Sequence, residues 1–92
     1  MKNSALIKSA QILKILGNAK RLEILYHITD KELNVGQLER AVKLSQSALS
    51  QHLAVLRKAG IVNTRRSAQT IFYSLNDPNV LKILDVISVI YS

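Results

Sequence analysis

The stretch LSQSALSQHLAVLRKAG, residues 44–60, forms one predicted helix with two contrasting faces. Leu49, Leu53 and Leu56 recur at the i, i+4, i+7 spacing that turns one stripe of an α-helix toward a core. The opposite face is formed by Ser47, Ser50, Gln51, Ala54 and Lys58. An ordinary solvated face mixes Glu with Lys, because such pairs stabilise a helix and keep it soluble. This face carries no acid, so its composition requires a second explanation.

The composition limits the chain to one small domain, residues 1–92. The absence of cysteine excludes disulfides, thiolate metal sites and thiol chemistry, and it is compatible with a reducing cytoplasm. Lys8, Gln11 and Lys14 interrupt the apolar N-terminal segment, so it resembles neither a signal peptide nor a membrane span. We therefore expect a soluble cytoplasmic protein with no membrane partner.

The positive charge is concentrated in one region. The formal net charge is +7, from thirteen Lys and Arg and six Asp and Glu. No acid occurs between Glu39 and Asp77. The basic residues in this window are Arg40, Lys43, Arg57, Lys58, Arg65 and Arg66. Because they are spread over a helix and a turn rather than along one amphipathic helix, they favour nucleic acid over an anionic membrane as the partner.

Capping residues mark the first two predicted helices. Residues 4–16 carry apolar side chains at helical spacing and stop at Gly17, which we expect to adopt the left-handed cap conformation. Asn18 is a good N-cap for a second, mostly buried helix that ends near Thr29 and Asp30. Both helices therefore precede the stretch at residues 44–60.

A helix-turn-helix follows. Asn34 and Gln37 form a variant of the capping box at the start of a short third helix. Ser45 is the N-cap of the opening helix, which ends at Gly60. Only three residues, 43–45, join the two helices, and this spacing is typical of a helix-turn-helix.

After Gly60 the period of the pattern changes. IVNTRR (61–66) and TIFYSL (70–75) are rich in β-branched and aromatic residues and are separated by SAQ, which predicts a hairpin with Arg65 and Arg66 near its tip. Asp77 and Pro78 then begin a final helix that is apolar around most of its circumference. This helix is too short to span a membrane, so we expect it to pack on a second subunit in a homodimer.

The order of these elements, with LSQSALSQHLAVLRKAGIV (44–62) and RRSAQTIFYSL (65–75), resembles the ArsR/SmtB family of winged-helix bacterial repressors. The match covers nearly the whole chain. The strings at 32–38 and 45–57 resemble the branch of the biofilm regulator BigR, the haemolysin regulator HlyU and the nodulation repressor NolR. The resemblance implies a mainly α fold, a winged helix-turn-helix of about five helices and a two-stranded wing.

The resemblance also implies a dimer whose paired recognition helices read an inverted repeat in double-stranded promoter DNA. The first and last helices, residues 4–16 and 78–91, are the implied dimerisation helices. The interface residues expected on them are Leu6, Leu13, Leu84, Ile87, Ile90 and Tyr91.

The sensor sites of the family are missing from this sequence. Asn34 and Gly36 stand where metal-sensing members have a cysteine-rich string, and the last helix offers Asp85 but no His. Tyr26 and Ser92 stand where the sulfur-sensing branch has its two cysteines. We therefore expect no metal, no cofactor and no dithiol switch, and the residues indicate no particular small-molecule effector.

The candidate DNA-binding residues lie on the recognition helix and the wing. They are Gln46, Ser47, Ser50, Gln51, His52, Arg57, Lys58, Arg65, Arg66 and Gln69. Ser and Gln side chains reach base edges in the major groove, and Gln pairs bidentately with adenine. Nothing near Arg65 and Arg66 in the sequence pairs with them, which favours a role in the minor groove or along phosphates.

Structural alternatives exist for several of these residues. The polar face is alternatively a solvated surface, and His52, beside the core stripe, is alternatively a packing residue. Arg57 and Lys58 also suit a solvated helix end, because the helix dipole favours cations there.

The sequence thus predicts a sequence-specific, dimeric DNA-binding transcriptional regulator, with repression as the expected activity. One alternative is an antirepressor that displaces a silencing protein from DNA. Another is a winged-helix module that binds RNA or protein. An enzyme is not expected, since the sequence has no glycine-rich phosphate loop, no cysteine nucleophile and no triad-like setting for its Ser and His residues.

Overall fold

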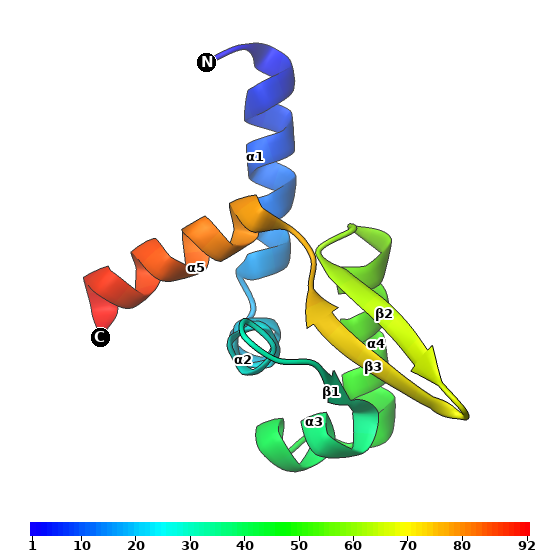
Figure 1. The fold of residues 1–92 in the computed structure, drawn as a ribbon. Coiled ribbons are helices and arrows are strands. Elements are labelled where there is room, and N and C mark those ends of the chain that lie inside the picture. The colour runs from blue at the N-terminus through cyan, green and yellow to red at the C-terminus, as the bar shows by residue number, and fades with distance from the viewer.

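The computed structural model describes all residues, 1–92, and confirms the expected winged helix-turn-helix (Figure 1). Five helices and a small antiparallel sheet form the molecule. Their order is α1 (Asn3–Leu16), α2 (Ala19–His27), β1 (Leu33–Asn34), α3 (Val35–Val42), α4 (Gln46–Lys58), β2 (Val62–Ser67), β3 (Thr70–Leu75) and α5 (Pro78–Tyr91). The tip of the β2–β3 hairpin extends beyond the helices, and the N-terminal half of α1 and the C-terminal half of α5 extend away from the rest of the molecule.

The predicted helix caps are present in the structure. The Asn18 side chain accepts hydrogen bonds from the backbone N–H groups of Lys20 and Arg21, at 3.0 and 3.1 Å. Asn34 and Gln37 form a complete capping box, with both hydrogen bonds at 2.9 Å. Asp77 caps α5 as expected and Pro78 is its first residue. These side chains satisfy backbone donors that have no partner within their own helix.

The expected left-handed conformation of Gly17 is wrong. Its φ is −75° and its ψ is 42°, and its N–H donates to the Leu13 carbonyl at 2.8 Å. A Cβ at this position would lie 3.1 Å from that carbonyl oxygen. Glycine at this position therefore allows a close approach of the backbone. Left-handed residues follow two other helices, Lys43 with φ 54° after α3 and Gly60 with φ 74° after α4.

The sheet contains one strand that the sequence pattern did not predict. Its order is β1-β3-β2, with the two residues of β1 paired antiparallel to β3. Within the hairpin, Arg65 lies opposite Phe72 and Arg66 opposite Ile71. Neighbouring residues of a strand point to opposite faces of the sheet, so the two arginines lie on different faces of the wing.

The core is entirely apolar and joins both ends of the chain to the helix-turn-helix. Leu49, Leu53 and Leu56 of α4 are buried, which confirms the predicted core stripe. Val80 and Leu84 bring the first turns of α5 into the same cluster. This packing fixes α4 with its polar face outward.

Candidate nucleic-acid interface

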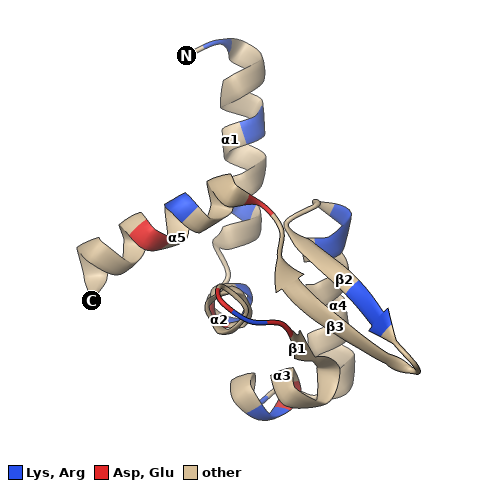
Figure 2. Ribbon diagram, in the orientation of Figure 1, with Lys and Arg blue, Asp and Glu red and all other residues tan.

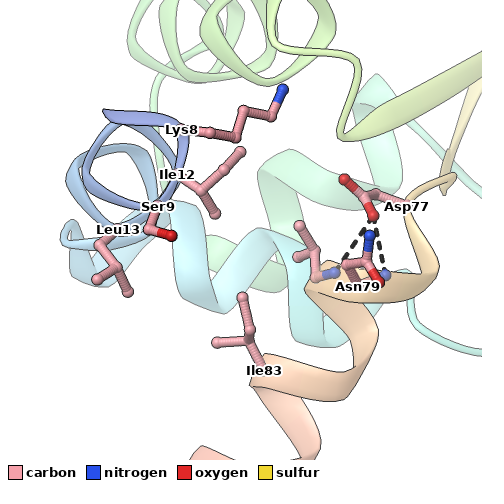
Figure 3. A pocket seen from close by; sticks show the side chains of 8 residues that line it. Lys8, Ser9, Ile12, Leu13, Asp77, Asn79 and Ile83 are labelled. Atoms are coloured by element: carbon pink, nitrogen blue, oxygen red, sulfur yellow. Dashed lines mark hydrogen bonds between the residues drawn. The ribbon is translucent and has the colours of Figure 1, made fainter. Parts of the chain in front are cut away.

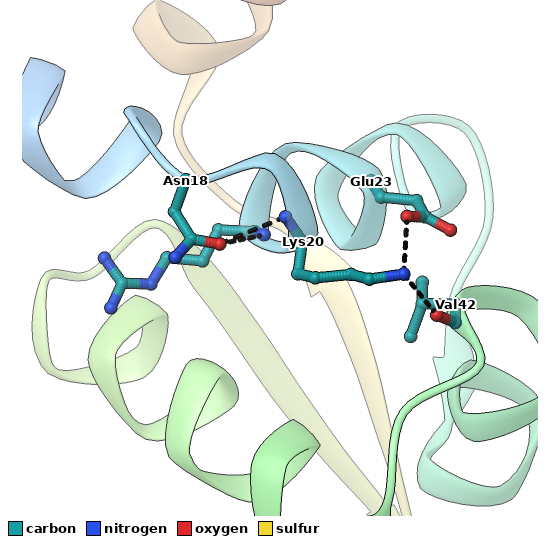
Figure 4. A network of polar contacts seen from close by, with 5 residues as sticks. Asn18, Lys20, Glu23 and Val42 are labelled. Atoms are coloured by element: carbon teal, nitrogen blue, oxygen red, sulfur yellow. Dashed lines mark hydrogen bonds and ion pairs between the residues drawn. The ribbon is translucent and has the colours of Figure 1, made fainter.

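The turn between α3 and α4 is held at both ends by side-chain contacts. Ser45 caps α4 by accepting a hydrogen bond from the backbone N–H of Ala48 at 3.3 Å. At the other end, Lys20 of α2 donates to the Val42 carbonyl at 2.9 Å and pairs with Glu23 at 3.3 Å (Figure 4). No local sequence pattern indicates the contact between Lys20 and the Val42 carbonyl, because these two residues are far apart in the chain. Together these contacts set the direction in which α4 leaves the turn.

The polar face of α4 is exposed and makes almost no contacts within the protein. Gln51, Arg57 and Lys58 form no intramolecular hydrogen bond or ion pair through their side chains, and the Ser47 hydroxyl lies 3.5 Å from that of Ser45. The exposed residues of this face are Gln46, Ser47, Ser50, Gln51, Ala54, Arg57 and Lys58. Their donors and acceptors are therefore available to an external partner.

His52 differs from the other candidates on α4, because it lies partly buried against α2. Its Nδ1 accepts a hydrogen bond from Arg21 Nε at 3.3 Å, and Arg21 Nη1 also donates to the Ile15 carbonyl at 3.3 Å. Burial lowers the pKa of His52, and the charge of Arg21 lowers it further. The ring is thus held neutral with its proton on Nε2. The sequence did not indicate Arg21, which is thirty-one residues from His52.

The two wing arginines occupy different environments. The sequence indicates no partner for Arg65 among its neighbours, but the fold supplies a distant one: the guanidinium forms an ion pair with Glu32 and lies over the Phe72 ring, with Cζ 4.7 Å from the ring centroid. Arg66 is exposed and forms no ion pair or side-chain hydrogen bond. Gln69, in the turn at the wing tip, lines an open groove between the wing and the start of α3. Both arginines are exposed, but only Arg66 has no partner within the protein.

The charge distribution separates these surfaces from the rest of the molecule (Figure 2). Basic residues lie at the end of α4 and on β2, and neither α4 nor the hairpin carries an acid. The acids lie on α2, α3, α5 and the connections that precede β1 and α5. The positive potential of α4 and the wing is therefore not cancelled by acids on the same elements.

Exposed apolar side chains gather on α1 and α5. Leu6, Leu13, Ile90 and Tyr91, all predicted interface residues, are 53, 60, 62 and 83% exposed, and Ile87 is half-buried. The prediction of Leu84 is wrong, since its side chain is fully buried in the core of the protomer. Exposed apolar residues that the prediction missed are Ile7, Val86 and Val89.

Hydrogen bonds join α5, from its middle onward, to α2. The Tyr26 hydroxyl donates to the Leu84 carbonyl at 2.8 Å, and the Ser88 hydroxyl donates to the Tyr26 oxygen at 3.1 Å.

No group of three or more His, Cys, Asp or Glu side chains is placed to hold a metal ion. No helix is long and apolar enough to cross a membrane.

Comparison with known proteins agrees with this geometry. Residues 18–64, from the cap of α2 into β2, match the family model described as "Bacterial regulatory protein, arsR family". The chain is 49% identical over 90 residues to the transcriptional activator HlyU of Vibrio cholerae serotype O1, covering 98% of this chain and 82% of HlyU.

Two solved structures have the same fold over nearly the whole chain. NolR from Sinorhizobium fredii superposes with a TM-score of 0.90 and 48% identity, covering 96% of this chain and 88% of NolR. The transcriptional repressor BigR from Xylella fastidiosa superposes with a TM-score of 0.88 and 33% identity, covering 100% of this chain and 98% of BigR. The chain therefore belongs to the arsR family of bacterial regulatory proteins.

Proposed function

We propose that this protein is a dimeric transcriptional repressor that binds an inverted repeat in promoter DNA. The observation that carries the proposal is the exposed, acid-free face of α4, whose polar side chains make almost no hydrogen bonds within the protein. A helix presented by a helix-turn-helix fits the major groove of duplex DNA. The membership of the arsR family supports a regulatory role.

The residues of the proposed interface divide by the chemistry of their side chains. Ser47, Ser50 and Gln51 carry the hydroxyl and amide groups that read base edges, and Gln pairs bidentately with adenine. Arg57, Lys58 and Arg66 suit phosphate oxygens, which attract cations without reading sequence. Phosphate contacts thus provide affinity, and the three polar residues of α4 provide sequence preference.

Dimerisation through α1 and α5 is part of the proposal. Both helices expose large apolar side chains. Clusters of exposed apolar side chains on a protein surface mark interaction sites. A groove of about 330 Å³ between α1 and α5 adds apolar area beside them, lined by Ile12, Leu13, Val80 and Ile83 and by four polar residues (Figure 3). In a two-fold dimer the recognition helices lie roughly 34 to 36 Å apart, which spaces the half-sites about one helical turn apart. We place this dimer in the cytoplasm, at the nucleoid where promoter DNA lies.

A binding competition tests the choice of ligand. The full chain is titrated with a random-sequence duplex, the corresponding single strands and a structured RNA at one fixed salt concentration. We expect the duplex to bind most tightly, and selection from the random pool to enrich an inverted repeat. Preference for RNA or single strands, or enrichment of a site without two-fold symmetry, would contradict the proposal.

A second candidate function is relief of silencing by displacing another DNA-bound protein. The observation that favours it is the name of the relative HlyU, which is a transcriptional activator. A reporter driven by the selected promoter distinguishes the two functions in strains with and without the silencing protein. Repression lowers reporter output in both strains, whereas relief of silencing raises it only where the silencer is present.

A further inference from the structure

Three side chains from across the sheet meet on the face of the wing that carries Arg65. Arg65 Nε donates to both carboxylate oxygens of Glu32, at 3.0 and 3.1 Å, and Nη2 donates to the same carboxylate. The guanidinium also lies over the Phe72 ring. We call Glu32, Arg65 and Phe72 the wing anchor.

The wing anchor spans the whole width of the sheet. Arg65 belongs to β2, Phe72 to the central strand β3, and Glu32 directly precedes β1 at the opposite edge. Arg65 and Phe72 are directly opposite in the register, so their side chains share one face of the sheet. The contact therefore connects the hairpin to the segment that leads into α3 and the helix-turn-helix.

The contacts between Glu32 and Arg65 hold the two side chains more firmly than a single exposed ion pair would. Such pairs contribute little when the two side chains are otherwise free to move. Here the guanidinium makes two-point contact with the carboxylate and is also stacked on an aromatic ring, two arrangements that favour arginine. The hydrogen bond from Arg65 lowers the pKa of Glu32, and the same contact raises the pKa of Arg65, so both groups stay charged.

A two-residue strand needs such support. β1 consists of Leu33 and Asn34 alone, and a strand this short gains few ladder hydrogen bonds. The wing is otherwise a two-stranded ribbon that projects from the body of the molecule. A contact from β2 across β3 to the start of β1 restricts how far that ribbon can swing.

We propose that Arg65 is a positioning residue, which together with Glu32 and Phe72 fixes the wing against the helix-turn-helix so that Arg66 meets the DNA backbone. The carboxylate of Glu32 balances the charge of Arg65 at the protein surface, whereas Arg66 on the other face has no acidic partner. This inference rests on the proposed binding of DNA, and it assigns different roles to two adjacent arginines.

Salt dependence separates the two roles. We expect Glu32→Gln and Arg65→Gln each to weaken binding about two- to fivefold for each wing, with the double variant no weaker than either single one. Neither single variant should change the slope of log affinity against log salt, because the pair neutralises no phosphate. Arg66→Gln is the matched control, and it should flatten the slope by about 0.9 for each phosphate that Arg66 neutralises. A flatter slope for Arg65→Gln, equal to that of Arg66→Gln, would overturn the inference.

A charge exchange provides the second test. The double variant Glu32→Arg, Arg65→Glu keeps the net charge of the wild type and restores an ion pair across the same strands, so we expect it to bind DNA about as tightly as the wild type. If Arg65 itself contacted phosphate, the acid in its place would repel DNA, and the exchanged variant would bind more weakly than the wild type despite its equal net charge.

Amide hydrogen exchange keeps this inference separate from the proposed function. It is measured by NMR on the full chain without DNA, and we expect faster exchange in β1 and β3 for Glu32→Gln than for the wild type. Unchanged exchange would contradict the wing anchor whether or not the protein binds DNA. Failure of the wild type to bind any duplex, with faster exchange in Glu32→Gln, would refute the proposed function and leave the wing anchor supported.

Discussion

At the scale of single residues, His52 is a polar side chain of α4 whose contacts lie within the protein. Its Nδ1 is engaged by Arg21, whose guanidinium also reaches the last turn of α1 through the Ile15 carbonyl. The neutral imidazole is the acceptor in this contact, and protonation would remove the acceptor and place two positive charges side by side. The link between α1, α2 and α4 therefore includes a titratable group whose pKa is lowered in the folded protein.

The protein should lose stability as the pH falls through this titration. The pKa of His52 is lowered in the folded state, first by burial and then by Arg21, so the unfolded state binds the proton more readily. The contribution of His52 is fully present above its unfolded pKa of about 6.5 and is lost as the pH falls through the lower folded value. The free energy of unfolding, measured with urea between pH 7.5 and pH 5, should fall for the wild type.

The matched control for this prediction is His52→Asn, which keeps an acceptor for Arg21 but does not titrate. Its unfolding free energy should depend less steeply on pH over the same range, because the remaining slope comes from the other titrating groups. An identical slope in the two proteins would show that His52 does not titrate as its contacts require.

At the scale of elements, α4 combines a buried stripe with an exposed polar face. Substitutions on these two faces should therefore have different effects on stability. Leu53→Ala removes a buried side chain from the core and should lower the free energy of unfolding by about 2 to 5 kcal/mol. Urea denaturation checks this value. Ser50→Ala, on the exposed face, is the control and should change stability by less than about 0.5 kcal/mol. A stability loss of equal size in both variants would contradict the division of faces.

The elements could be predicted because their signals are local in the sequence. Asn34 with Gln37, Ser45 and Asp77 lie within three residues of the backbone groups that they cap, and the leucine stripe of α4 is a spacing within one helix. β1 could not be predicted, because two residues are too few for an alternating pattern and the strand forms only where β3 meets it.

The candidate site could be predicted only in part, because several of its contacts join distant segments. Glu32 lies thirty-three residues from Arg65, so the partner of that arginine depends on the order of strands in the sheet. The same holds for Arg21 and His52. Leu84 illustrates a different difficulty: a helix that is apolar on most sides does not reveal which side its own protomer buries.

At the scale of the whole molecule, α1 and α5 expose large apolar side chains that the proposed dimer would cover. Ile90→Asp would place an unpaired charge in the proposed interface, where burying it is costly, so we expect this variant to dissociate. Sedimentation at micromolar concentration measures the shift from dimer to monomer. Asn63→Asp adds the same charge on exposed β2 and should leave the dimer unchanged. If Ile90→Asp remained dimeric, the interface would lie elsewhere.

Metals and oxidants should not change the affinity of the protein for duplex DNA. The chain has no cysteine and no cluster of metal-ligating side chains, and Tyr26 is bonded to the Leu84 carbonyl and to Ser88. We expect duplex affinity, measured by fluorescence anisotropy, to be the same with and without zinc, and before and after treatment with persulfide or reductant. A large and reversible loss of affinity with any of these agents would reveal a sensor site formed by other residues.

Binding of the selected duplex and of a scrambled duplex across a range of salt concentrations tests most directly whether α4 reads bases while the wing contacts the backbone. Gln51→Ala should lose roughly 1 to 3 kcal/mol of preference for the selected duplex for each base contact, with an unchanged salt slope. Arg66→Ala should weaken both duplexes alike and flatten the slope by about 0.9 for each phosphate that Arg66 neutralises, doubled in a symmetric dimer. A Gln51→Ala protein with unaltered sequence preference would contradict base reading by the polar face of α4 and leave that face an ordinary solvated surface.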